Sequence, residues 1–306
     1  MKGGKADPIV SVAHAQGRRF YHLAGQNKLL TETVLPELCN LIFDSKHLER
    51  GKPLADNSVA DRSVADSSKL AELLRARLDV LDIDLSPLDI RTLSGGRGGS
   101  CIVNVGNERF ACKQYLRGGM PGRLNRSRYL WTGWHRTRAL REMQLLVDCH
   151  ELDLPAARPV FCAVQRWGLI YRAILLTQWL EAAPTLAAVL SDRPLLEAEW
   201  QRLAAMLMAF FKAGIMHPDL NATNILLRDS RHPKLIDFDR GQHCDPSDPT
   251  WQVGMLKRLR RSLVKLQLAD SDFHYDDGVD WSLLLAAIER VRDTGQTSNG
   301  SHLPEA

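Results

Sequence analysis

The chain has 306 residues, of which 44% are hydrophobic and 25% are charged. This composition is typical of a soluble globular protein and excludes collagen-like and fully disordered chains. Forty Lys and Arg against thirty-six Asp and Glu give a net charge of +4. Such a small excess does not by itself mark a nucleic-acid-binding protein.

The first 85 residues differ in composition from the rest. Residues 56–68 read DNSVADRSVADSS, an imperfect repeat of small and polar side chains. Such a stretch buries too little apolar surface to offset the entropy lost on ordering, so we expect a flexible linker. Apolar residues in 29–43 and helical periodicity in 70–81 indicate two short helices. We interpret residues 1–85 as an N-terminal extension and assign it no chemistry.

The next part of the chain, residues 86–180, has mainly strand-like patterns. These patterns occupy 89–93, 101–105, 108–115 and 168–180. One helix is expected over 137–150, where apolar residues recur on one face. A basic insertion, 116–136, separates the third strand from this helix. We expect residues 86–180 to form a small sheet-rich lobe.

The rest of the chain has mainly helical patterns. Helices are expected over 195–213, 251–268 and 281–292, and two short strands over 225–227 and 234–236. We expect residues 181–292 to form a helical lobe, followed by a polar tail over 293–306. Strands followed mostly by helices predict an α+β fold with two lobes.

Neither a membrane-spanning helix nor a disulfide framework is indicated. The longest apolar candidate, 203–216, is shorter than the ~18 residues that span a bilayer, and it contains Lys212. The six cysteines are scattered, without a CxxC pair. The first 17 residues lack the apolar core of a secretion signal. We therefore expect a cytosolic chain, or one that lies on a membrane without crossing it.

The strongest chemical signal is the sequence HPDLNATN, which begins at His217, followed by DFD, which begins at Asp237. Phosphoryl transfer needs a carboxylate to accept the proton of the attacking hydroxyl, and oxygen ligands for Mg²⁺. The spacing matches the protein-kinase signature, with Asp219 as catalytic base and Asn224 and Asp237 as metal ligands. Alternatively, Asp219 and Asn221 cap a turn and Asp237 ends a strand.

A kinase also needs a loop that lets the backbone approach the phosphates of ATP. Gly96, Gly98 and Gly99 lie between two expected strands, and Cys101 stands where the signature has its third glycine. Glycine permits such close approach because it has no side chain. A simple hairpin turn would have the same composition.

The kinase signature further requires a strand lysine that contacts the phosphates and a helix glutamate that pairs with it. Lys113 ends the sequence FACK of its expected strand. Glu142 is the best candidate for its partner because it lies on the expected helix, and Glu151 is a weaker one. The alternative for Lys113 is a solvated charge at a strand end.

From Lys113 to Arg141 the chain contains eight basic residues and no acidic one, with Tyr129, Trp131 and Trp134 interleaved. Basic and aromatic stretches bind nucleic acid or anionic lipid headgroups, or form a solvated loop. Beside an ATP site we favour an anionic acceptor. Its candidate ligands are Arg117, Arg123, Arg126, Arg128, Arg136 and Arg138. The basic amphipathic helix 251–268 is expected either to lie on an anionic membrane or to pack on the core.

Several segments together are similar to a known family over about residues 86–268. YLWTG at 129–133 and RTRALRE at 136–142 are the most specific segments, and the HPDLNATN and DFD sequences are shared more widely. In these features the chain resembles the lipopolysaccharide core kinases that act on 3-deoxy-D-manno-octulosonic acid (Kdo). The resemblance implies a protein-kinase-like fold with two lobes.

The resemblance also implies a reaction and a place. ATP, with Mg²⁺, would phosphorylate the 4-hydroxyl of Kdo on a Kdo–lipid A precursor. The enzyme would be peripheral, on the cytoplasmic face of the inner membrane, with no nucleic-acid partner. Asp239 replaces the glycine of the D-F-G sequence and no A-P-E sequence follows, which argues against a protein substrate.

Two alternatives remain open. The chain could be a kinase for another acceptor, such as a core heptose. It could also be a degraded kinase fold that binds nucleotide or anionic lipid without turnover. No expected catalytic residue is missing, and the insertion is basic, so we favour the Kdo kinase.

Overall fold

The structure is a computed structural model that describes residues 9–14, 17–24, 26–28, 30–44, 71–76, 78–79, 88–92, 100–115, 129–181, 183–228 and 232–297. The chain divides into two compact units. The sheet unit comprises chiefly Lys5–Gln144 and Arg158–Trp179, and the helical unit comprises chiefly Leu145–Ala157 and Leu180–Ala306.

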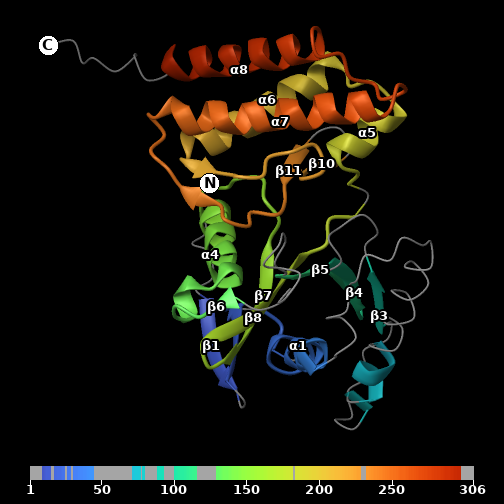
Figure 1. Cartoon of the computed structure of the whole chain (residues 1–306), viewed down its shortest axis with the longest axis vertical. Helices are drawn as coiled ribbons and strands as arrows, with labels where there is room; N and C mark the ends of the chain where they lie inside the picture. Colours follow the sequence, from blue (N-terminus) through green and yellow to red (C-terminus); the bar gives the residue numbers. More distant parts are fainter. Residues whose placement is uncertain are drawn as a thin grey trace, which may run out of the picture. The chain divides into compact units, whose positions relative to one another are not determined.

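The sheet unit is built on one eight-stranded antiparallel sheet (Figure 1). Its strands are β1 (Ile9–His14), β2 (Arg18–Leu23), β3 (Leu88–Thr92), β4 (Ser100–Val105), β5 (Glu108–Gln114), β6 (Tyr129–Leu130), β7 (Pro159–Trp167) and β8 (Ile170–Gln178). The strand order is β1-β2-β7-β8-β5-β4-β3, and β6 pairs with β8 beside this path. The central strands β7 and β8 are mostly buried, which explains why β7 lacks the alternation that marks a half-buried strand.

Helices cover part of this sheet. A one-turn π-helix η1 (Leu30–Val34) leads into α1 (Leu35–Asp44). The buried face of α1 joins one hydrophobic core with side chains of the sheet, among them Phe110 and Phe161. Helical residues 71–76 add Leu74 to the same core. A short 3-10 helix η3 (Trp134–Arg136) precedes α4 (Arg138–Glu151), within which the boundary between the two units falls.

Part of the expected N-terminal extension belongs to the sheet. β2 pairs with β7, and its buried Arg18 donates a hydrogen bond to Asn40 Oδ1 of α1 at 2.5 Å. β1, β2 and α1 are thus part of the sheet unit and no appendage to it. The expected linker 56–68 lies outside the described residues. The expected tail 293–306 begins too early, because α8 continues to Thr297, and residues 298–306 lie outside the described residues.

The helical unit contains α5 (Leu186–Asp192), α6 (Glu197–Lys212), α7 (Pro249–Ala269) and α8 (Asp280–Thr297). Figure 1 shows α6, α7 and α8 lying along one another. Two small sheets complete the unit: β9 (Ile215–Met216) with β12 (Gln242–His243), and β10 (Ile225–Arg228) with β11 (His232–Leu235). No helix among the described residues is long and apolar enough to span a membrane.

The basic helix expected over 251–268 corresponds to α7. Its apolar residues Met255, Leu259 and Leu263 are buried in the helical unit, while Lys257 and Arg261 are exposed. This favours the interpretation that the apolar side packs on the core. A large antiparallel sheet and a mainly helical unit together confirm the predicted α+β fold.

Candidate active site

Lys113 is positioned by the middle of the sheet. It lies on β5, opposite Ser100 of β4 and Leu175 of β8. Its Nζ lies 2.7 Å from Glu142 Oε2 on α4. The two side chains are exposed to different extents, 24% for Lys113 and 3% for Glu142. The structure therefore pairs the lysine with the glutamate on α4, while the alternative Glu151 is an exposed residue at the end of that helix.

Tyr115 is a second partner of Glu142 that the sequence analysis missed. Its hydroxyl donates to the same Oε2 at 2.5 Å, and its ring centroid lies 4.8 Å from Lys113 Nζ. Tyr115 follows Lys113 by two residues, so both side chains leave the same face of the chain. A buried carboxylate is costly unless it is paired and hydrogen-bonded. Here an ammonium group and a phenol hydroxyl satisfy it together.

The structure describes two of the six expected acceptor arginines. Arg136 is exposed on η3. Arg138 opens α4, and its Nη1 donates to the Tyr129 hydroxyl at 2.8 Å. Its guanidinium also lies over the rings of Tyr129 and Tyr115. The other four, Arg117, Arg123, Arg126 and Arg128, and the three glycines Gly96, Gly98 and Gly99 lie outside the described residues.

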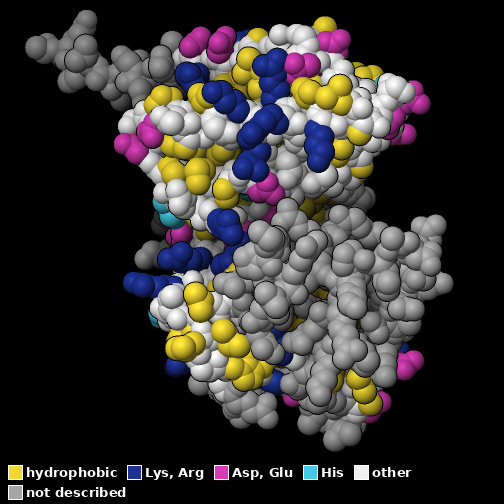
Figure 2. Space-filling model, viewed as in Figure 1, with side chains coloured by type: hydrophobic (Ala, Val, Ile, Leu, Met, Phe, Trp, Pro, Cys, Tyr) yellow, Lys and Arg dark blue, Asp and Glu magenta, His cyan; other side chains and the backbone are white. Residues whose placement is uncertain are grey.

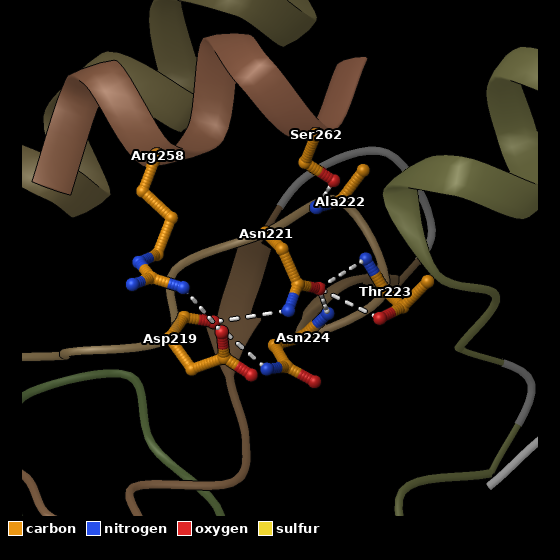
Figure 3. A network of polar contacts seen from close by, with 7 residues as sticks. All are labelled: Asp219, Asn221, Ala222, Thr223, Asn224, Arg258 and Ser262. Atoms are coloured by element: carbon orange, nitrogen blue, oxygen red, sulfur yellow. Dashed lines mark hydrogen bonds and ion pairs between the residues drawn. The ribbon is translucent and has the colours of Figure 1, made fainter. Parts of the chain in front are cut away.

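Asp219 lies in the helical unit, in the loop that connects β9 to β10. Its side chain is 53% exposed, and its Oδ1 lies 3.0 Å from Arg258 Nη1 of α7. The backbone carbonyl of Asp219 accepts hydrogen bonds from Asn221 Nδ2 at 3.1 Å and Asn224 Nδ2 at 2.9 Å. The backbone is thus fixed on one side while the carboxylate remains accessible to solvent (Figure 3).

Asn221 shapes the turn of this loop. Its Oδ1 accepts hydrogen bonds from the backbone of Thr223 at 2.9 Å, the Thr223 hydroxyl at 2.6 Å and the backbone of Asn224 at 3.1 Å. Asparagine is favoured in such turns because its side chain can bond to backbone groups two residues further on. The turn expected as an alternative to the catalytic loop is therefore present, and the same turn places Asp219 and Asn224.

Three side chains of α7 contact this loop. Met255 Sδ accepts the backbone N–H of His217 at 3.4 Å, and Ser262 Oγ accepts that of Ala222 at 3.2 Å. Arg258 lies between them in sequence. Residues three and four apart share one helix face, so a single stripe of α7 holds the loop. The sequence indicated the basic character of α7, but no pattern in it identified Arg258 as the residue that reaches Asp219.

The DFD segment is joined to the same loop through His217. This buried histidine donates from Nε2 to the carbonyl of Ile236 at 2.9 Å, and its ring packs edge-on against Phe238 at 4.7 Å. The backbone of Ile236 in turn donates to the carbonyl of Asn224 at 3.0 Å. Asp237, the next residue, is exposed and has a left-handed φ of 63°, a conformation that aspartate adopts more readily than most residues.

Asn224 and Asp237 offer the kind of oxygen atoms that Mg²⁺ prefers. Because Asn224 Nδ2 donates to the carbonyl of Asp219, its Oδ1 is left as an acceptor, and among the described residues nothing donates to it. Mg²⁺ is commonly held by one or two carboxylates together with substrate phosphates, without a cage of protein ligands. Consistently, no three His, Cys, Asp or Glu side chains gather into a metal site within the described part of the chain. The two residues therefore fit this ion.

Residues 89–275 match the model of the lipopolysaccharide kinase (Kdo/WaaP) family. The chain belongs to this family. A 3-deoxy-D-manno-octulosonic acid kinase of Xanthomonas oryzae pv. oryzae is 45% identical over 175 residues, 56% of this chain and 69% of the relative. The enzymes of the same name from Xanthomonas axonopodis pv. citri and Stenotrophomonas maltophilia are 43% and 39% identical over 176 residues, 57% and 56% of this chain, and 69% of each relative.

The chain is therefore a lipopolysaccharide kinase, a phosphotransferase. The family match includes the Lys113–Glu142 pair, the loop with Asp219 and Asn224, and Asp237. It does not include β1, β2 or α1, although these elements share the sheet and the core with the matched part.

Proposed function

We propose that this kinase transfers the γ-phosphoryl group of ATP to the 4-hydroxyl of Kdo on a Kdo–lipid A precursor, in the synthesis of the lipopolysaccharide inner core. One observation carries the proposal: the exposed carboxylate of Asp219 stands on a loop that is fixed by its own turn and by α7. The acceptor is inferred from relatives of 39–45% identity that are named as kinases of this sugar.

Asp219 is proposed as the catalytic base. Its carboxylate accepts the proton of the acceptor hydroxyl while that oxygen forms a bond to the γ-phosphorus and the bond to the departing ADP oxygen breaks. Arg258 binds Oδ1 of this carboxylate, which leaves Oδ2 to face the acceptor. Holding the base in place lowers the barrier because less orientational entropy is lost in the transition state.

Lys113 is proposed as the phosphate-binding lysine. The bond to Glu142 places its ammonium group, and the ring of Tyr115 limits where it can move. Phosphoryl transfer is accelerated mainly by positioned charge, so an ammonium group held in advance lowers the cost of binding the phosphates of ATP. Gly96, Gly98 and Gly99 are proposed to offer backbone N–H groups to the same phosphates.

Asn224 and Asp237 are proposed as the magnesium ligands, through Oδ1 and the carboxylate respectively. When bound, Mg²⁺ neutralises negative charge on the phosphate oxygens. Ile236, which precedes Asp237, donates a backbone hydrogen bond to the carbonyl of Asn224. This bond holds the backbones of the two ligand residues close together.

The arginines of the basic insertion are proposed to bind the anionic acceptor, because a guanidinium group pairs with carboxylates and phosphates through two hydrogen bonds. They are Arg117, Arg123, Arg126, Arg128, Arg136 and Arg138. Arg138 already donates a hydrogen bond to the Tyr129 hydroxyl, so it would position Tyr129 next to the acceptor. We also propose that the enzyme works peripherally at the cytoplasmic face of the inner membrane, where ATP meets the lipid acceptor.

The test is transfer of label from γ-labelled ATP to Kdo-bearing lipid A precursor in detergent with Mg²⁺. The native chain should label the lipid, and Asp219→Ala should not. Asp272→Ala, which alters another exposed aspartate of the helical unit, is the matched control and should label it normally. If the native chain labels only a heptose-bearing core lipid, the acceptor assignment is wrong. If it labels neither lipid, the proposal that this chain is active on lipopolysaccharide precursors fails.

A further inference from the structure

Two strongly exposed leucines lie on neighbouring stretches of backbone at one end of the sheet unit. Leu130 is 67% exposed and Leu169 is 77% exposed, more than any other large hydrophobic side chain described in that unit. Leu130 lies on β6 opposite Ile170 of β8, and the carbonyl of Leu169 accepts the backbone N–H of Trp131 at 2.8 Å. Figure 2 shows hydrophobic side chains gathered over this end of the unit, in the lower left of the view.

Leu169 occupies an unusual place for a leucine. β7 and β8 form a hairpin in which Trp167 pairs with Ile170, so Gly168 and Leu169 alone make the turn. Gly168 has the left-handed φ of 53° that such a tight turn requires. The other turn position usually has a polar residue or a second glycine. The Leu169 side chain, 77% exposed, gains little packing from the described residues. Exposed apolar side chains that gather into a patch mark interaction surfaces.

Indole rings and guanidinium groups surround the two leucines. Trp131 and Trp134 pack edge to face with centroids 4.6 Å apart. The guanidinium of Arg166 lies 4.9 Å from the ring of Trp131, and that of Arg19 lies 4.5 Å from the ring of Trp134. Tryptophan is enriched at the boundary between lipid headgroups and acyl chains. Arginine can cover an aromatic face and still present its charge to headgroup phosphates.

The segments that form this part of the sheet carry charge of one sign. Residues 9–24, 129–141 and 158–180, which form β1, β2, β6, η3, β7 and β8, contain no Asp or Glu. Of their eight arginines, Arg19, Arg166 and Arg172 lie over the rings of Trp134, Trp131 and Trp167 respectively. An apolar tip with several arginines beside it is complementary to an anionic bilayer surface.

We propose that these residues form a docking tip that inserts into the headgroup layer of an anionic bilayer. The docking tip comprises Leu130, Trp131, Trp134, Arg166 and Leu169. The two leucines and the indoles enter the boundary layer, and the arginines contact lipid phosphates. The inference deepens the proposed function, since a kinase whose acceptor is embedded in a bilayer must reach that bilayer.

The exposed side of α7 is the rival surface. Lys257, Arg261 and Lys265 form an exposed row at a spacing of four residues, and Leu268 stands 83% exposed beyond it. Figure 2 shows basic side chains along this helix. The apolar side chains in line with this row are Val253, which is 44% exposed, and Leu268. The row contains no tryptophan, so it offers mainly charge. Charge alone attracts a protein to a membrane, whereas buried apolar area retains it there.

The experiment is flotation of the full chain with phosphatidylcholine vesicles, with or without phosphatidylglycerol. The native chain should float with the anionic vesicles and far less with the neutral ones. Leu130→Ser combined with Leu169→Ser should weaken this binding about tenfold or more, because two leucines lose their burial. The matched control is Leu196→Ser combined with Leu268→Ser, which alters leucines of the helical unit that are 67% and 83% exposed.

Three results would overturn the docking tip. They are failure of the native chain to float with anionic vesicles, unchanged binding by the Leu130 and Leu169 variant, and equal loss by the control, which would place the contact on the helical unit. The vesicles contain no Kdo lipid and no ATP, so their binding does not depend on the kinase reaction. Conversely, if the proposed function holds, the docking-tip variant keeps native turnover on a deacylated, water-soluble Kdo acceptor.

Discussion

The two candidate catalytic carboxylates, Glu142 and Asp219, stand in opposite environments. Glu142 is 3% exposed in the sheet unit, where one oxygen accepts from both Lys113 and Tyr115. Asp219 is 53% exposed in the helical unit, where one oxygen meets a single arginine of α7. At Glu142 the side chains of Lys113 and Tyr115 bind the carboxylate directly. At Asp219 most hydrogen bonds are made by the backbone carbonyl, and the carboxylate stays accessible.

This difference follows from what each group is proposed to do. A carboxylate that only positions a lysine can be buried, because its hydrogen-bonding partners are side chains of the same folded unit. A carboxylate that accepts a proton from an incoming hydroxyl must be reachable, so it forgoes the stability that burial with partners would give. Loss of Glu142 should therefore cost both stability and activity, while loss of Asp219 should cost activity alone.

The largest expected effect is that of Asp219→Asn. The amide keeps the shape of the side chain but cannot take up the proton, so turnover should fall about 10²–10⁴-fold. The free energy of unfolding should change by less than about 0.5 kcal/mol, because the altered group is largely in solvent. Initial rates and denaturant unfolding of the same preparation test both parts. Equal turnover by the variant would remove Asp219 from the role of base.

Glu142→Gln should lower both stability and activity. The amide leaves Lys113 without its counter-charge and gives Tyr115 a weaker acceptor, at a cost of about 1–3 kcal/mol of stability. The KM for ATP should rise more than kcat falls, since the lysine acts on the nucleotide. Glu151→Gln, at the exposed end of the same helix, is the control and should change neither. A Glu142 variant with native stability would show that the buried pair does not support the sheet unit.

Arg258→Gln tests whether Arg258 positions the Asp219 carboxylate without contributing to stability. An exposed ion pair adds about 0–1 kcal/mol to stability, so the unfolding midpoint should hardly move. Misplacing the base should nevertheless reduce kcat about tenfold with an unchanged KM for ATP. Arg258→Lys should recover part of the loss, and Arg261→Gln on the same helix should have no effect. A shift in KM for ATP with constant kcat would assign Arg258 to nucleotide binding.

Local patterns were enough to predict most elements near the site. The alternation in 108–115 and the helical period in 137–150 correspond to β5 and α4, and these two elements carry Lys113 and Glu142. β7 was missed because a strand buried on both faces shows no alternation. β2 lacks alternation for the same reason: five of its six residues are buried, Arg18 among them. β1, which pairs with β2, was also missed.

The Lys113–Glu142 contact was predicted because the kinase signature contains it. Contacts between distant elements that lie outside this signature could not be predicted. Arg258 reaches Asp219 across 39 residues, and nothing in the spacing of charges along α7 distinguishes it from Arg261. Tyr115 was within reach of sequence reasoning, because it follows Lys113 on the same strand face. Its partner Glu142 lies 27 residues further on. That Tyr115 and Lys113 bind the same oxygen of Glu142 is therefore seen only when β5 and α4 are packed together.

The smallest expected effect is that of Asn221→Ala, which tests whether the turn made by Asn221 is needed to place Asp219. Asn221→Ala removes the Oδ1 acceptor used by Thr223 and Asn224, which should cost about 1 kcal/mol and lower turnover a few-fold. Asn221→Asp keeps an oxygen acceptor for Thr223 and Asn224 but replaces the donor to the carbonyl of Asp219 with a negative oxygen, so it should recover more of the stability than of the turnover. Unfolding curves and initial rates of the two variants give the comparison. If Asn221→Ala were as fast as the native chain, the turn would not be needed to place Asp219, and the contacts from α7 would be sufficient to hold the loop.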